Sequence, residues 1–241
     1  MKHVVKACDN QAQDQWATLY LHMAQELVHR HTLEGKAIVR EGIRKFAAKT
    51  AQERREALFA AGCKANLETF FSHGFGLPCG DRTQKEWIRH TEQELFVNIA
   101  ACPYAECWNG ETHEIGRMFC EEFYPSLVHA GTSEKAQINL GHTVLDGRSD
   151  YCRLSIYLRP ANLSAAQRPL CFPEFDLESP APARALDYIP DFAPQKTRLI
   201  TAFLLAARER GSEDCLNTIH AAVQSYAGKY GDPAVLKALE E

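Results

Sequence analysis

The stretch ELFVNIAACPYAECWNGETHEIGRMFCEE (residues 94–122) contains the change of hydrophobic period that decides the fold. In its first part Leu95, Val97 and Ile99 occupy every second position, as on one face of a β-strand. Further on, Ile115 and Phe119 recur four residues apart, as on one face of a helix. The stretch therefore predicts a strand that passes into a helix.

The segment after this helix predicts a β-hairpin. In AQINLGHTVLDGRSDYCRLSIYLRP (residues 136–160), two alternating runs flank Asp146 and Gly147, a dipeptide typical of tight turns. The side chains expected on the apolar faces of the two strands are Ile138, Leu140, His142 and Val144, followed by Cys152, Leu154, Ile156 and Leu158. The middle of the chain thus reads as strand, helix and hairpin.

The region before this unit predicts helices. Residues 12–31 carry an apolar stripe at helical spacing, made of Trp16, Leu19, Tyr20, Met23 and Leu27. Such a stripe is typical of a packed core. Residues 33–62 predict a second helix, which Gly62 ends. Residues 71–82 are rich in glycine and form a connection, and we expect a short helix after it.

The region after residue 160 begins irregularly and then returns to helix. Residues 168–195 hold most of the eleven prolines and predict an excursion along the surface. Residues 196–210 and 212–230 predict helices. The sequence therefore predicts an α+β fold with N-terminal helices, a small antiparallel sheet within a strand-helix-hairpin unit, and C-terminal helices. We expect a domain over residues 1–160 and a helical extension over residues 161–241 packed on it.

Composition and charge argue against two classes of partner, nucleic acids and membranes. The net charge is −4 and no block of basic residues occurs, which argues against a nucleic-acid partner. No apolar run is long enough to span a bilayer, so we predict no membrane partner. Nine cysteines, an odd number spread along the chain, favour reduced thiols in a cytoplasmic protein. The apolar stripe of the first helix is compatible with a homodimer.

Three cysteines are candidates for chemistry. Cys120 lies at the border of the apolar helix face, and His113 and Arg117 lie on the same side of the helix. A nearby histidine or arginine favours the thiolate, which is the reactive form of cysteine. Cys102 ends the first strand, a position from which a rigid element directs a side chain, and Cys152 begins the last strand. Core packing is the alternative interpretation of all three.

The same stretch also offers soft metal ligands. Cys102, Cys107, His113 and Cys120 would suffice for tetrahedral zinc. Their spacing is not that of paired zinc knuckles, and Arg117 stands where an H-E-x-x-H motif needs its second histidine. We therefore predict neither a metal nor another cofactor.

Three segments together carry a resemblance to a known family. They are CPYAE (102–106), EIGRMFCEEFYPSL (114–127) and HTVLDGRSDYCRLSIYL (142–158). In this order they resemble the L-2-amino-thiazoline-4-carboxylic acid hydrolase family, whose hallmarks are a strand ending in Cys-Pro, a helix with Cys-Glu and a hairpin with a late cysteine. Residues 33–62 are similar to the N-terminal part of the family.

The resemblance implies a hydrolase of a small heterocyclic or amidine-like substrate. Water adds to C2 of an aminothiazoline ring, the ring C–S bond breaks, and an N-carbamoyl amino acid results. Such a reaction needs a nucleophile, an acid for the departing thiolate and a cationic anchor for the carboxylate. Cys120 or Cys102 is the candidate nucleophile, Glu121 or His113 the acid or base, and Arg117 the anchor.

The site predicted in this way has eight members. They are the catalytic candidates Cys102, His113, Cys120, Glu121 and Cys152 and the substrate-binding candidates Asn98, Arg117 and His142. Two alternatives stay open. One is a small-molecule sensor of the V4R type without catalysis, and the other is a protein that binds metal through cysteine and histidine.

Overall fold

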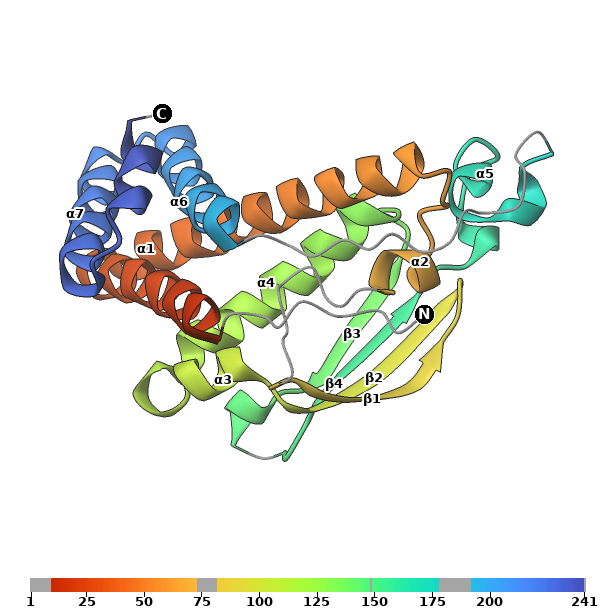
Figure 1. The fold of residues 1–241 in the computed structure, drawn as a ribbon, viewed down its shortest axis with the longest axis horizontal. Helices are drawn as coiled ribbons and strands as arrows, with labels where there is room; N and C mark the ends of the chain where they lie inside the picture. The colour runs from red at the N-terminus through yellow and green to blue at the C-terminus, as the bar shows by residue number, and fades with distance from the viewer. Residues whose placement is uncertain (1–9, 73–81, 148, 178–191, 241) are drawn as a thin grey trace.

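The computed structural model describes residues 10–72, 82–147, 149–177 and 192–240. Its helices and strands are α1 (Asn10–Ala60), α2 (Leu67–Phe71), β1 (Gln84–His90), β2 (Glu94–Ala101), α3 (Pro103–Trp108), α4 (His113–Gly131), β3 (Gln137–His142), β4 (Cys152–Tyr157), α5 (Arg168–Cys171), α6 (Phe192–Glu209) and α7 (Glu213–Tyr230). Five 3₁₀ turns complete the described elements: η1 (Gly110–Thr112), η2 (Val144–Asp146), η3 (Pro160–Asn162), η4 (Pro173–Phe175) and η5 (Pro233–Leu239). The predicted α+β class is confirmed (Figure 1).

The long helix α1 consists of two helical segments joined at a kink. Thr32 has a φ of 47° and a ψ of −111°, which no α-helix accommodates. The kink falls between the two predicted helices, so their separation is confirmed. At the far end the N–H of Cys63 donates to the carbonyl of Leu58 at 2.9 Å, and Gly62 has a φ of 74°. Gly62 therefore ends this helix as predicted, because the left-handed conformation suits glycine.

The four strands form one antiparallel sheet in the order β1-β2-β4-β3. The predicted alternation of β2 is confirmed, since Leu95, Val97 and Ile99 are buried. The short helix expected after residues 71–82 is wrong: that segment is the edge strand β1, and the short helix α2 lies before the connection. The sequence of β1 gave little sign of a strand, because only one of its faces packs and Ile88 is 56% exposed beside a register shift.

One residue of the predicted hairpin lies on the other face of the sheet. Leu140 pairs with Leu154, but His142 pairs with Arg153, so the register shifts at Gly141. This bulge turns His142 away from the apolar face that Ile138 and Leu140 share, and His142 is exposed. The antiparallel pairing of the two strands is confirmed, but the tight Asp-Gly turn is not, because β3 ends at His142 and β4 begins at Cys152. Val144, predicted on the strand, lies in η2, which Gly147 ends in the left-handed conformation with a φ of 64°.

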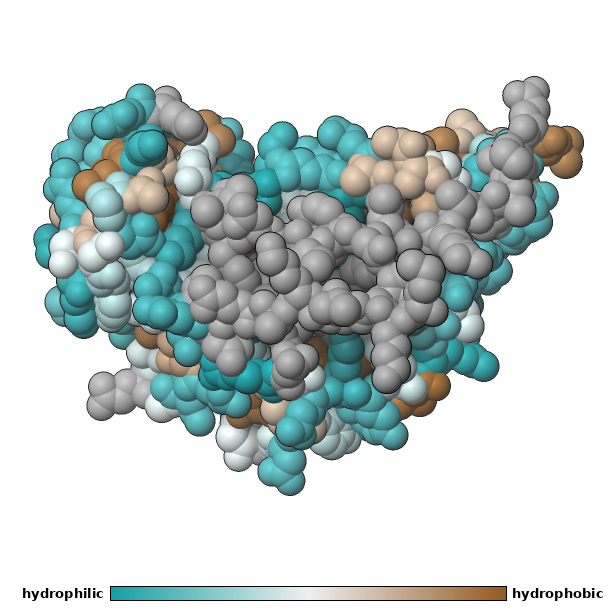
Figure 2. Space-filling model, viewed as in Figure 1, coloured by the Kyte–Doolittle hydropathy of each residue, from teal (hydrophilic) through white to brown (hydrophobic). Residues whose placement is uncertain are grey.

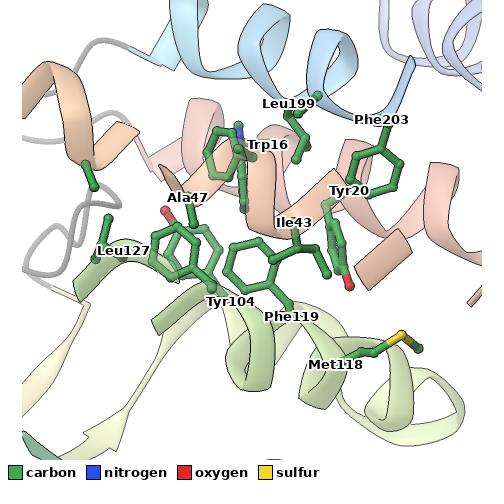
Figure 3. Close-up of a cluster of buried hydrophobic side chains, with 14 of the residues drawn as sticks. Trp16, Tyr20, Ile43, Ala47, Tyr104, Met118, Phe119, Leu127, Leu199 and Phe203 are labelled. Carbon is green, nitrogen blue, oxygen red and sulfur yellow. The ribbon is translucent and has the colours of Figure 1, made fainter. Parts of the chain in front are cut away.

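One core extends from the sheet through α4 and α1 to α6 and α7, and α4 lies between α1 and the sheet (Figure 1). In this core Trp16 of α1 packs against Tyr104 of α3 and Phe119 of α4, with ring centroids 5.5 and 5.6 Å apart (Figure 3). The apolar stripe predicted for residues 12–31 is therefore core. Helices α6 and α7 pack on α1 at the end of the molecule away from α5 (Figure 1).

The segment after β4 is irregular where it is described. It contains the turns η3 and η4 and the single helical turn α5, while residues 178–191 of the proline-rich excursion lie outside the described residues. Hydrophobic side chains gather on the surface near α5, among them Leu170 and Leu177, which are 41% and 98% exposed (Figure 2). The predicted helices of residues 196–210 and 212–230 are confirmed as α6 and α7.

Candidate active site

A small cavity brings together three of the predicted cysteines. Cys102 immediately precedes α3, Cys120 lies in the second turn of α4, and Cys152 begins β4. The cavity has a volume of about 30 Å³, and its other walls are mostly apolar side chains: Ile99, Tyr104, Ala105, Trp108, Phe119, Tyr124, Leu140, Thr143, Leu145 and Leu154. A space of this size holds about one or two water molecules and no organic substrate.

The three thiols are held in the neutral form. Burial raises the pKa of Cys120 well above its ordinary value of 9.0, and the neighbouring thiols of Cys102 and Cys152 raise it further. Burial raises the pKa of Cys152 to about 11, although the backbone N–H of Val144, 3.3 Å from its sulfur, acts in the opposite direction. Burial also raises the pKa of Cys102. Since the thiolate is the nucleophile, none of the three is activated in this closed state.

Cys102 differs from the other two thiols because it lines two compartments. It lines the inner cavity and also an outer groove of about 210 Å³, which Glu106 and Asn109 border. The backbone amides of Tyr104 and Ala105 lower its pKa and partly offset the effect of burial. Of the three cysteines, Cys102 is therefore the one that borders both the inner cavity and the outer groove.

A larger, polar cleft lies beside the cysteine cavity. It has a volume of about 450 Å³, and its lining includes the predicted residues His113, Arg117 and His142. His113 is the first residue of α4 and its Nδ1 lies 2.9 Å from the carbonyl oxygen of Gly110, while Arg117 follows one turn later. His142 reaches the cleft because the bulge at Gly141 turns it outward. A cleft of this size suits a small organic ligand.

Asp146 lines this cleft with an acidic group, although its sequence context predicted only a turn. It ends η2, where its Oδ2 accepts a hydrogen bond from the backbone N–H of Thr143 at 3.2 Å. Its Oδ1 lies 3.1 Å from Nη1 of Arg117. The spacing T-x-x-D from Thr143 to Asp146 is a capping signal that places an acidic side chain at this position. The cleft thus carries charges of both signs.

The turn η2 is a common wall of the two compartments. Thr143 and Leu145 line the cysteine cavity, whereas Asp146 lines the cleft. The negative charge of Asp146 contributes to the raised pKa values of Cys120 and Cys152, after the effect of burial. A movement of η2 would therefore join the cleft to the thiols.

Two predicted residues lie outside both compartments. Glu121 points along α4, with its Oε1 2.8 Å from Nε of Arg117 and its Oε2 3.3 Å from Nη2 of Arg40. Asn98 lies on the outward face of β2, where its side-chain oxygen accepts a hydrogen bond from Nε of Arg153 at 3.3 Å. The cysteines lie on the other face of the sheet, so Asn98 is not brought to them.

The ligands considered for zinc are divided among these places. Cys102 and Cys120 line the cavity, His113 lines the cleft, and the sulfur of Cys107 lies 3.8 Å from the hydroxyl of Thr18 on α1. Within residues 10–72, 82–147, 149–177 and 192–240, no group of three or more His, Cys, Asp or Glu side chains is arranged to hold a metal ion. The seven cysteines of these residues are all free thiols.

None of the described helices combines the length and the apolar character that crossing a membrane requires.

A known family matches the part of the chain that forms the cavity and the cleft. The family model described as L-2-amino-thiazoline-4-carboxylic acid hydrolase matches residues 13–155, more than half of the chain. The chain therefore belongs to this family, which is named for a hydrolase. Comparison with curated proteins and with solved structures returned no match. The match includes every predicted site residue from Asn98 to Cys152 and leaves α6 and α7 outside.

Proposed function

We propose that the protein hydrolyses a small amidine-like heterocycle that bears a carboxylate, of the 2-aminothiazoline-4-carboxylate type, in the cleft between α4 and the hairpin. The observation that carries this proposal is the presence of Arg117 and Asp146, 3.1 Å apart, in one cleft of about 450 Å³. Such a substrate carries a carboxylate at one end and a basic amidine at the other. The two side chains match both ends.

Substrate binding would replace the ion pair between Arg117 and Asp146 with two new ion pairs to the substrate. The guanidinium of Arg117 presents its donors in a planar fork that suits a carboxylate, and the carboxylate of Asp146 accepts hydrogen bonds from an amidinium. Each side chain gains a partner of opposite charge from the substrate as the pair separates. His113 and His142 line the same cleft and add donors for the carboxylate.

The reaction forms one bond and breaks another at C2 of the ring. A water oxygen attacks C2 and loses a proton to a base, the C2–S bond breaks, and the departing thiolate takes up a proton. The product is an N-carbamoyl amino acid with a free thiol. Asp146 is the proposed base, since it is the carboxylate of the cleft, and His113 or His142 is the proposed acid.

A thiol of the protein is the alternative nucleophile, and Cys102 is the best placed. Its thiol would lose a proton to a base and attack C2, the C2–S bond would break as the ring sulfur takes up a proton, and an isothiourea linked to Cys102 would form. Water would then attack the same carbon and displace the sulfur of Cys102 as a thiol, which gives the N-carbamoyl product. The raised pKa of Cys102 favours water as the nucleophile. Within the thiol route, Cys102 is favoured over Cys120 and Cys152 because it also lines the outer groove.

The test is turnover of 2-aminothiazoline-4-carboxylate by the full chain, with the carbamoyl product followed by NMR. We expect Arg117→Gln to raise KM about 10- to 100-fold, because a charge-assisted contact to the carboxylate is lost. Asp146→Asn should lower kcat by about 10² or more through loss of the base. Cys102→Ser separates the two nucleophiles, since only the thiol route is abolished by it.

The control is Arg89→Gln, which removes an exposed arginine of β1 at the opposite edge of the sheet. Turnover should survive this change. Binding of the substrate without turnover would instead support the small-molecule sensor. Equal kinetics for Arg117→Gln and the wild-type chain would refute the assigned anchor.

A further inference from the structure

A row of basic side chains on α1 faces acidic side chains on α4. Lys36, Arg40 and Arg44 follow one another at intervals of four residues, which places them on one side of the helix. Nζ of Lys36 lies 3.9 Å from Oε2 of Glu114, and the two arginines reach Glu121 and Glu122. Most of these contacts simply join two helices, but the one made by Arg40 continues into the cleft.

Glu121 connects Arg40 to the cleft through its two oxygen atoms. Oε2 lies 3.3 Å from Nη2 of Arg40, and Oε1 accepts a hydrogen bond from Nε of Arg117 at 2.8 Å. Nη1 of Arg117 then lies 3.1 Å from Oδ1 of Asp146. A continuous series of ion pairs, Arg40–Glu121–Arg117–Asp146, therefore runs from α1 across α4 to η2.

Each end of this series is itself held in place. Nη1 of Arg40 also donates to Glu122, which receives a second hydrogen bond from Nε of Arg44 at 2.6 Å. At the other end, the backbone of Thr143 holds Asp146. The hydrogen bond to Glu121 is the largest cause of the raised pKa of Arg117, ahead of the charge of Asp146. Glu121 is also the closer of the two partners of Arg117, at 2.8 Å against 3.1 Å for Asp146.

We infer that Arg40 is a positioning residue of the cleft: it holds Glu121 in the rotamer that directs the guanidinium of Arg117 toward the substrate carboxylate. This inference rests on the proposed function in so far as Arg117 binds substrate. It gives Glu121 a role other than the acid or base predicted from the sequence.

The physical reason is the exposure of the anchor. The side chain of Arg117 is 53% exposed and would sample many rotamers without a partner on α4. A side chain that is already ordered loses less conformational freedom when the ligand binds. Removing Arg40 should therefore weaken substrate binding in the ground state and the transition state alike, which raises KM and leaves kcat unchanged.

Arg44 provides a matched control on the same helix. Like Arg40 it is a half-exposed arginine that bonds Glu122, but its other partner is Glu41 and not Glu121. Arg40→Gln and Arg44→Gln both remove a charge and a contact to Glu122, while only Arg40→Gln removes the contact to Glu121. Any difference between the two variants reports on the connection to Arg117.

The first readout is independent of turnover. The Nε–Hε resonance of Arg117 in ¹⁵N-labelled protein is identified by its loss in Arg117→Lys. We expect Arg40→Gln to shift or broaden this resonance, Arg44→Gln to leave it in place, and Arg40→Lys to restore it in part. An unchanged resonance in Arg40→Gln, or the same shift in both glutamine variants, would overturn the inference.

The second readout is the kinetics of 2-aminothiazoline-4-carboxylate hydrolysis. Arg40→Gln should raise KM about two- to fivefold at constant kcat, the range that an exposed ion pair supports, and Arg44→Gln should not. In an Arg117→Gln background, Arg40→Gln should have no further effect. Multiplicative effects of the two changes would contradict the inference. A wild-type chain without turnover would refute the proposed function, and the resonance of Arg117 would still decide the role of Arg40.

Discussion

At the scale of single residues, burial of the cysteines opposes formation of the reactive thiolate. Cys102, Cys120 and Cys152 meet around one cavity, as a thiol site requires, yet burial raises the pKa of each. His113 and Arg117, which were expected to favour the thiolate, face the polar cleft and not the sulfur atoms. The thiols can therefore act on a ligand in the cleft only if η2 opens the cavity to it, whereas Asp146 and the two histidines already line the cleft.

The raised thiol pKa values predict a loss of stability at alkaline pH. Cys152 has a pKa of about 11 in the folded chain against 9.0 as its ordinary value, so between these values the folded chain keeps a proton that the unfolded chain releases. The contribution of the neutral Cys152 thiol to the unfolding free energy is complete below pH 9 and is lost as the pH rises toward 11. Urea unfolding across this range should show a smaller fall of the unfolding free energy in Cys152→Ala than in the wild-type chain. Parallel curves would contradict the assigned pKa.

At the scale of elements, the kink of α1 depends on a close approach of two backbones. The turn at Thr32 brings the chain back on itself, so that a Cβ atom on Gly35 would lie 2.0 Å from the carbonyl oxygen of Leu27. The side chain of His31, next to the kink, bonds the hydroxyl of Thr218 on α7 at 2.8 Å. The kink therefore determines how the first segment of α1 meets the C-terminal helices.

Two glycine substitutions should have opposite effects on stability. Gly35→Ala forces a methyl group against the backbone of Leu27 and should lower the unfolding free energy by about 1–3 kcal/mol. Gly228 lies inside α7, and no heavy atom is found within 4 Å of the position its Cβ would take. Gly228→Ala should therefore raise the unfolding free energy by about 0.5–1 kcal/mol, as expected for alanine in a helix. Thermal or urea unfolding measures both, and a Gly35→Ala variant as stable as the wild-type chain would contradict the close approach at the kink.

At the scale of the whole molecule, the C-terminal helices are packed against the family region. Phe203 of α6 is fully buried, with its ring 6.3 Å from that of Tyr20 and in contact with Gly42 of α1. The hydroxyl of Tyr226 on α7 donates to the carbonyl of Gln15 at 2.8 Å. The division between residues 1–160 and 161–241 stays a prediction, but these contacts lead us to expect that both parts unfold together.

The three tryptophans make this expectation testable. Trp16, Trp87 and Trp108 all lie within residues 13–155, so tryptophan fluorescence reports on the family region, whereas far-UV circular dichroism reports on all helices. The two urea transitions should coincide. Phe203→Ala removes a core aromatic side chain and should lower the unfolding free energy by about 3–5 kcal/mol. The midpoints of both transitions should therefore fall together. A fluorescence midpoint that does not respond to Phe203→Ala would show that the parts fold independently.

The order of elements followed from local patterns in the sequence. The period of two in residues 94–101 and the helical period after His113 each depend on neighbouring residues, and both are confirmed. The Asp-Gly dipeptide ends η2 and does not join the two strands directly. The family could also be predicted from the sequence, because its motifs are short and lie in one part of the chain. The edge strand β1 was missed, since a strand with one packed face and a register shift has no clear alternation.

By itself, the sequence of this protein determined its α+β class, the strand-helix-hairpin unit and the residue types of its site, because each of these follows from side chains close together in the chain. Only the tertiary structure decided that the thiols and the charged groups occupy separate compartments. That separation depends on the bulge at Gly141 and on η2 as a shared wall. The capping signal of η2 is local, but its place as a wall comes from packing against α3 and α4, which no local period encodes.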